Sequence, residues 1–237
     1  MKTMYGIIGM IAVAFGVSSC TTSTILKARF NDLSLGPAHD LAGAPTGDRI
    51  EYIPELASGL KVRAWETSTI KALEFSKVNT GGISGHNTWL EFRGVSSNLA
   101  ETVWFVYNAR LTGSDAEVIT DLSDGSGSPI ARMKINAAGQ VRLVRSDYTT
   151  ENLIGTIPVG VRHNVIFVVR GKEALFNLLI ASPGQELIRI DNQPTFTTNP
   201  LEFHNPCHPS ISFNFAEGTG FDGKYTIADM TITRKNP

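Results

Sequence analysis

Cysteine is almost absent from this chain. Of 237 residues only two are cysteines, Cys20 and Cys207. Small exported domains that cannot build a sufficient core are held together by several disulfides, and a single possible pair excludes a framework of that kind. A chain of this length buries about 70% of its extended surface when it folds, so hydrophobic burial alone can stabilise it.

An excess of charge of one sign is also missing. Lysine and arginine number 21, aspartate and glutamate number 22, and the formal net charge is −1. A protein that binds nucleic acid displaces counterions from the phosphates with a basic patch, and its composition is usually basic. The balance of charges therefore argues against nucleic acid as a partner, and against an acidic disordered tail.

Long hydrophobic runs are missing, apart from one near the start. This run extends from Ile7 to Phe15 and is too short to span a hydrocarbon core about 30 Å thick. Lys2 precedes it, and Val17-Ser18-Ser19-Cys20 follows it. This order is typical of an export signal. The last four residues resemble the bacterial lipobox, in which an aliphatic residue and two small residues precede a cysteine.

The lipobox predicts a bacterial lipoprotein. We expect residues 1–19 to be the signal peptide, residues 20–28 to be a tether lipidated at Cys20, and residues 29–237 to be one domain. Acyl chains such as palmitate on Cys20 would make membrane attachment effectively permanent, and Cys207 would then lack a partner. Thr21 stands where an aspartate signals inner-membrane retention in many Gram-negative bacteria. We therefore expect an outer-membrane anchor in the cell envelope, facing the periplasm or the surface; an ordinary secretory signal is the alternative.

Amphipathic helices are absent from the remainder of the chain. The apolar runs are short, rich in β-branched and aromatic residues, and bounded by turn residues, which is typical of an all-β sandwich or barrel. Ala137-Ala138-Gly139 supplies a three-residue hairpin turn with glycine at the position of positive φ, and Gly171-Lys172-Glu173 supplies a second one. We expect strands at 60–65, 72–78, 88–93, 102–111, 116–122, 130–136, 140–145, 164–170, 174–181, 187–190, 210–215 and 225–234.

The stretch from Ile130 to Ala181 resembles the middle of concanavalin A-like, laminin-G-like jelly rolls. The resemblance rests on a strand ending in a glycine turn (KINAAGQVRLV), a further segment (IGTIPVGVRHNVIFVV) and a third strand (ALFNLLIA). The closing strand from Tyr225 to Ile232 also fits. The resemblance implies a two-sheet antiparallel β-sandwich, in which the concave sheet often holds carbohydrate.

The catalytic signatures of enzymes with this fold are missing. Glycosidases of this kind carry Glu-x-Asp-x-x-Glu on one strand, which sets two carboxylates at the working distance, and no such run occurs here. Alginate lyases carry an Arg-rich strand, a Gln-x-His strand and a Tyr-x-Lys strand, and none of these appears. We therefore expect carbohydrate binding without cleavage. A polysaccharide lyase or glycosidase with an unrecognised site, and a structural or partner-binding lipoprotein, remain the alternatives.

Strand alternation indicates which side chains could contact a sugar. On three expected strands the face opposite the apolar one mixes indoles, amides and guanidinium groups, which stack on sugar C–H groups and donate to hydroxyls or carboxylates. If the three strands are neighbours, these residues form one carbohydrate-binding groove. The alternative is that Trp104 belongs to the core and the charges are a solvated face. The predicted binding residues are Trp89, Trp104, Asn108, Arg110 and Arg132.

Two loops contain side chains that could bind a metal. The run from Glu202 to His208 includes His204 and Cys207, which are zinc-type ligands. The run from Asp121 to Gly127, which includes Asp124, offers the oxygen ligands that calcium prefers. Neighbouring ligands in a loop broken by proline rarely all point inward, and a fourth zinc ligand is unassigned, so for the first loop we favour a surface loop. The second run lacks the spacing of a known calcium loop, so there we favour a polar turn. We expect no cofactor and no metal.

Overall fold

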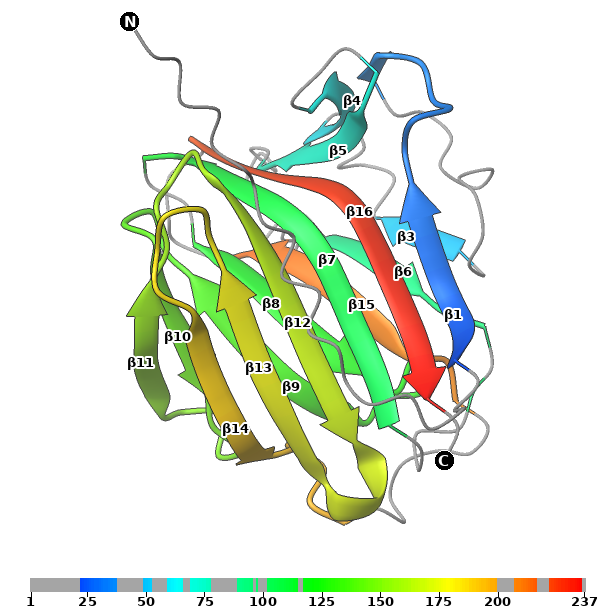
Figure 1. Ribbon diagram of the computed structural model, residues 1–237, viewed down its shortest axis with the longest axis vertical. Helices are drawn as coiled ribbons and strands as arrows, with labels where there is room; N and C mark the ends of the chain where they lie inside the picture. The colour runs from blue at the N-terminus through cyan, green and yellow to red at the C-terminus, as the bar shows by residue number, and fades with distance from the viewer. Residues whose placement is uncertain are drawn as a thin grey trace, which may run out of the picture.

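The computed structural model describes residues 22–37, 49–52, 59–65, 69–77, 89–95, 97, 102–114, 117–199, 207–216 and 222–235. About two thirds of them lie in strands, and two sheets pack face to face (Figure 1). Within these ranges no helix is long and apolar enough to cross a membrane. The predicted signal peptide and Cys20 lie outside the described residues, so export and lipidation remain predictions.

One sheet has nine strands. Its order is β14-β13-β12-β7-β16-β5-β4-β2, and β1 also pairs with β16. All of its pairs are antiparallel. The strands are β1 (Thr22–Arg29), β2 (Gly36–Pro37), β4 (Leu60–Ala64), β5 (Lys71–Ser76), β7 (Thr102–Gly113), β12 (Arg162–Arg170), β13 (Leu175–Ala181), β14 (Ile188–Pro194) and β16 (Gly223–Lys235).

The other sheet has seven strands in the order β11-β10-β9-β8-β15-β6-β3. Its pairs are antiparallel as well. The two-sheet antiparallel sandwich predicted from the spacing of the apolar runs is therefore confirmed. The strands are β3 (Arg49–Tyr52), β6 (Trp89–Arg93), β8 (Val118–Ser123), β9 (Pro129–Ile135), β10 (Gln140–Val144), β11 (Glu151–Thr156) and β15 (Ser210–Phe215).

The core lies between the inner faces of the two sheets. Along β7 every second side chain is buried, from Val103 to Leu111, because successive residues of a strand point to opposite faces. Aromatic rings join the layers: Tyr107 of β7 meets Phe213 of β15 with ring centroids 5.3 Å apart. The predicted alternation is thus confirmed, and the remaining side chains of each strand form an outer face that points away from the core.

The first predicted hairpin turn is confirmed, and the second differs in detail. Gly139 has a φ of 74°, and a Cβ there would lie 2.0 Å from the carbonyl oxygen of Ile157, so only glycine fits. In the second hairpin the positive φ, 51°, falls on Ala174, whereas Gly171–Glu173 form a short 3-10 turn.

The predicted tether boundary at residue 28 is wrong. Thr22–Arg29 form β1, which pairs with β16 from Thr22 opposite Lys235 to Arg29 opposite Asp229. Ile25, Leu26 and Ala28 are buried. The segment therefore belongs to the sandwich because it contributes apolar side chains to the core, and the domain begins at Thr22.

Candidate functional site

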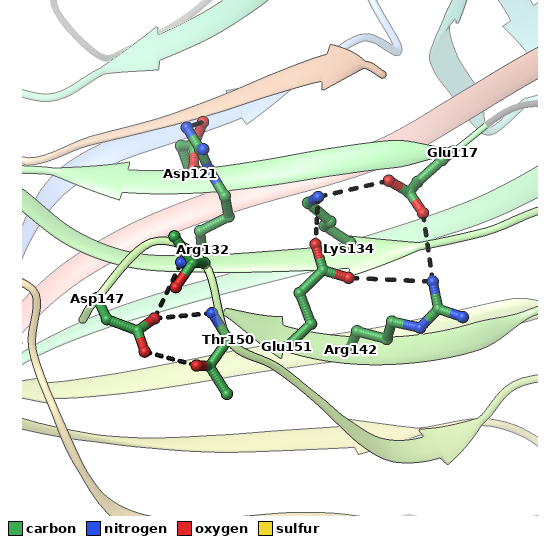
Figure 2. Close-up of polar contacts among 9 residues, drawn as sticks. Glu117, Asp121, Arg132, Lys134, Arg142, Asp147, Thr150 and Glu151 are labelled. Carbon is green, nitrogen blue, oxygen red and sulfur yellow. Dashed lines mark hydrogen bonds and ion pairs between the residues drawn. The ribbon is translucent and has the colours of Figure 1, made fainter. Parts of the chain in front are cut away.

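The outer face of the seven-stranded sheet carries a dense set of polar side chains. On β8, β9 and β10 the inner residues are buried in the core, so the residues between them point outward. The strand register sets Asp121 of β8 opposite Arg132 of β9, and Lys134 of β9 opposite Arg142 of β10. Figure 2 shows these side chains gathered on one surface.

Arg132 and Asp121 form a bidentate pair. The Arg132 Nε donates to Oδ1 of Asp121 at 2.6 Å and its Nη2 donates to Oδ2 at 3.0 Å. Pairs of this geometry fix the plane of the guanidinium as well as its position. The hydrogen bond to Asp121 raises the pKa of Arg132 above its ordinary value. The pair is therefore a fixed, charged element of the surface.

Beside this pair, four charged side chains form a closed network (Figure 2). Lys134 bridges Glu151, with which it hydrogen-bonds, and Glu117 at 3.7 Å. Arg142 lies 3.8 Å from Glu117 and 4.0 Å from Glu151. Partly exposed ion pairs each contribute little to stability. Their main effect here is that two cations directly opposite each other on adjacent strands are balanced by two carboxylates.

The turn between β10 and β11 presents an aromatic ring. Tyr148 is 51% exposed and has a φ of 61°, in the left-handed region that non-glycine residues rarely adopt. The centroid of its ring lies 4.4 Å from the centroid of the Phe196 ring. The carboxylate of Asp147 accepts hydrogen bonds from the backbone of Thr149 and Thr150 and from the Thr150 hydroxyl. The neighbouring carboxylate therefore holds the turn in its strained shape.

The hydrogen bonds in this turn affect the acidity of its groups. They lower the pKa of Asp147 to about 2, with the Thr150 hydroxyl as the main cause. Partial burial raises the pKa of Tyr148, while the charges of Arg132 and Asp121 act on it in opposite directions. Val144, which precedes this turn, stands opposite Arg132 in the strand register, so the turn lies beside the bidentate pair. An aromatic ring, a guanidinium and a carboxylate share this part of the surface, and together they can stack on C–H groups and hydrogen-bond hydroxyls.

The structure divides the five predicted binding residues between the two sheets. Arg132 lies on β9 and Trp89 on β6 of the seven-stranded sheet, where the Trp89 side chain is outside the described residues. Trp104, Asn108 and Arg110 lie on β7, in the other sheet. The expectation of one groove from three neighbouring strands is therefore wrong, because alternation assigns a face within each strand but not the sheet to which the strand belongs.

The structure places one further predicted residue, Trp104, and adds a residue that the sequence analysis did not identify, Tyr148. Trp104 is half-buried on the outer face of β7, so the alternative that it belongs to the core is wrong. Tyr148 was missed in the sequence because its surroundings, Asp147 to Thr150, have the composition of an ordinary polar turn. The sequence signal for this turn is Asp147 with Thr149 and Thr150 two and three residues later, a spacing that favours a turn capped by the aspartate side chain.

In the two loops considered for metal binding, the described residues are engaged with protein groups. Asp121 pairs with Arg132, and the buried Asp124 accepts from the backbone of Ser126 and Ser128. Cys207 is a buried thiol that donates to the carbonyl of Ser97. In the described part of the chain, no three His, Cys, Asp or Glu side chains are grouped as metal ligands. Glu202 and His204 lie outside it.

No protein-family model matches the chain, and no curated protein sequence matches it. A GH131 beta-glucanase catalytic domain from Podospora anserina has a similar structure, with a TM-score of 0.59 and 11% identity over 89% of this chain and 95% of that chain. The winged bean acidic lectin, in complex with methyl-alpha-D-galactose, gives a TM-score of 0.55 and 9% identity over 91% and 98%.

A third structure, the catalytic domain of the glycoside hydrolase family 131 protein from Coprinopsis cinerea, gives a TM-score of 0.58 and 11% identity over 88% of this chain and 93% of that chain. At such identities the likeness shows the fold alone. The chain is a concanavalin A-like jelly roll of the kind found in lectins and in glycoside hydrolases, as the sequence predicts.

Proposed function

We propose that this protein binds carbohydrate on the outer face of the seven-stranded sheet, at the site formed by Tyr148, Arg132 and Asp121, and does not cleave it. The observation that carries the proposal is the exposed Tyr148 ring, held in a strained turn beside a bidentate Arg–Asp pair. Strained backbone persists where the surrounding structure enforces it, and it is concentrated at functional sites.

The geometry suits sugar recognition. The Tyr148 ring packs against Phe196, so it is positioned before a ligand arrives and little conformational entropy is lost on binding. The Arg132 hydrogen bonds to Asp121 use Nε and one position on Nη2, which leaves other guanidinium N–H groups for ligand oxygens. The fold supports the same class of ligand, since it is shared by a lectin solved with a galactoside and by a beta-glucanase domain.

The carboxylates of this surface favour binding over hydrolysis. A glycosidase needs two carboxyl groups flanking the scissile bond, one of them a proton donor. Asp121 is held by two hydrogen bonds from Arg132, and Glu117 and Glu151 are each in contact with Lys134 and Arg142. Each of these three carboxylates is thus engaged by a cation of the same sheet, which supports binding rather than cleavage.

The proposal includes the membrane anchor at Cys20 in the outer membrane. Its basis is the Val17-Ser18-Ser19-Cys20 sequence. Because the sandwich begins at Thr22, the lipid would be about 7 Å of extended chain from the fold, which would hold the domain close to the bilayer. Labelled palmitate should enter the wild-type protein and not Cys20→Ala. Equal labelling of the two would contradict the anchor.

A glycan array on the purified protein, followed by calorimetry with the strongest ligand, tests the binding site. Tyr148→Ala keeps the backbone strain but removes the ring, and we expect an affinity about ten- to thirtyfold weaker, equivalent to about 1–2 kcal/mol of stacking. Leu153→Ala is the matched control, since Leu153 is also exposed on the neighbouring strand. Absence of any glycan ligand would contradict binding, and new reducing ends in the bound glycan would show that the protein is an enzyme.

A further inference from the structure

A cavity of about 300 Å³ opens on the outer face of the nine-stranded sheet, away from the site proposed above. It is lined by residues of β1, β7, β12 and β16, by Asn31, and by both ends of the connection between β4 and β5. Trp65 and Ile70 line it from that connection, and the backbone N–H of Trp65 donates to the Ile70 carbonyl at 2.7 Å. These two side chains supply its apolar side.

The floor of the cavity is a polar row across three strands. Arg29 of β1 stands opposite Asp229 of β16, and Asp229 stands opposite Asn108 of β7. The Asn108 amide donates to Oδ1 of Asp229 at 2.6 Å. All three line the cavity, and Asp229 is the one carboxylate among its described lining residues. The row offers both donors and acceptors, which is what a polyhydroxylated ligand requires.

The next row of the same face concentrates positive charge. Arg162 of β12, which lines the cavity, stands directly opposite Arg110 of β7, and like charges in this position repel each other. The Arg110 guanidinium carbon lies 4.8 Å from the centre of the Trp65 ring, and its Nε is buried with no hydrogen-bond partner among the described residues. Among the described lining residues, two guanidinium groups, those of Arg29 and Arg162, stand against the one carboxylate of Asp229.

We propose that this cavity is a second binding site, specific for a hexuronic acid residue. The ligand's carboxylate would lie beside Arg162, its hydroxyls on the Asn108–Asp229 pair, and the C–H face of its ring against Trp65. The volume equals that of about ten water molecules, which suits one pyranose ring. An inorganic anion would satisfy the arginines but not the apolar wall or the Asp229 acceptor.

The site goes beyond the proposed function and does not depend on it, because it lies on the other sheet and uses other residues. Its specificity follows from charge. Arginine recognises carboxylates through paired N–H donors, so a neutral hexose, which has the same ring and hydroxyls, loses that interaction. Binding should also weaken as salt is added, because the cavity is open to solvent and its charges are screened.

The test is a titration of the purified protein with sodium glucuronate, read by tryptophan fluorescence and by ligand-observed NMR, with glucose as the neutral comparison. We expect saturable binding of glucuronate. Its affinity should be at least about tenfold higher than that of glucose, because glucose has no carboxylate to form a charge-assisted hydrogen bond with arginine. Arg162→Gln should weaken glucuronate about tenfold or more and leave glucose unchanged. Trp65→Phe should remove most of the fluorescence change while NMR still detects binding.

Arg189→Gln is the matched control. Arg189 is an exposed arginine on β14 of the same sheet, paired with Asp191 and away from the cavity, and its replacement should leave both titrations as they are. Melting temperatures of all variants separate loss of binding from loss of fold. Equal affinity for glucuronate and glucose, an unchanged affinity in Arg162→Gln, or no binding of glucuronate at all would each overturn the proposal.

Discussion

The two outer faces of the sandwich each place two cations directly opposite each other, and they differ in how these charges are balanced. On the seven-stranded sheet Lys134 and Arg142 face each other with Glu117 and Glu151 in contact with both. On the nine-stranded sheet Arg110 faces Arg162, and Arg110 packs on an indole, Trp65, rather than on a carboxylate.

The difference shows how one fold can present two kinds of surface. A balanced network neutralises the face and leaves an aromatic ring as its exposed feature, which suits a neutral glycan. An excess of guanidinium groups around a cavity creates a local positive field, which attracts an anionic ligand and raises its local concentration. The core between the sheets is common to both faces.

The largest effect is expected from breaking that common core. Phe213 is fully buried and packs edge-to-face against Phe92 and Tyr107. Phe213→Ala should lower the free energy of unfolding by about 3–5 kcal/mol, because a large ring is replaced by a cavity. Urea denaturation measures the change. Both binding activities should be lost in parallel; loss of one with full retention of the other would show that the two faces do not share one cooperative core.

Acid should act on the nine-stranded layer through His163. This side chain is buried on β12, and its Nε2 lies 3.0 Å from the Tyr225 hydroxyl. Burial lowers the pKa of His163 from 6.5 to about 4. The unfolded chain therefore binds a proton at a higher pH than the folded chain, so stability is full above pH 6.5 and falls as the pH drops toward 4.

The loss over that interval should be about 3 kcal/mol. Denaturation curves at several pH values should show this slope in the wild type, and His163→Gln should flatten it whatever its absolute stability. A slope that is the same in both proteins would assign the acid sensitivity to other groups.

Removal of one charge from each face tests whether the two faces differ in how much their charged side chains contribute to stability. Asp121→Asn leaves the Arg132 guanidinium without the carboxylate that fixes it, and we expect a loss of about 1–2 kcal/mol in stability. Arg162→Gln removes one member of the opposed arginine pair on an exposed position, and its effect should stay within about 0.5 kcal/mol. Thermal unfolding of both variants measures the two losses of stability. A larger loss for Arg162→Gln than for Asp121→Asn would contradict the expected order.

The fold could be predicted from the sequence because its determinants are local. The alternation along Thr102–Gly113 defines a strand with one buried face, and Gly139 marks a turn that only glycine can make. The sequence predicts a tether over residues 20–28 because they directly follow the signal peptide, yet the segment Thr22–Arg29 forms a strand. Its role as a strand depends on pairing with β16, and that partner lies at the opposite end of the chain.

The candidate site could be predicted only in part, for the same physical reason. Arg132 could be assigned to an outer face, but its neighbours depend on the order of strands in the sheet, which alternation does not determine. The residues around Tyr148 favour a capped turn, but its exposure and positive φ depend on hydrogen bonds that Asp147 makes in the folded turn. Similarly, the cavity beside Asn108 appears only when β1, β7, β12 and β16 are brought together.

Binding of a glycan by the seven-stranded face through Tyr148 can be tested with one pair of proteins. The affinity of the strongest array ligand is measured for the wild type and Tyr148→Ala, together with the melting temperature of each protein. We expect an affinity about ten- to thirtyfold weaker for the variant with an almost unchanged melting temperature, because Tyr148 is exposed and the strained backbone is kept. Equal affinity of the two proteins for that ligand would contradict it.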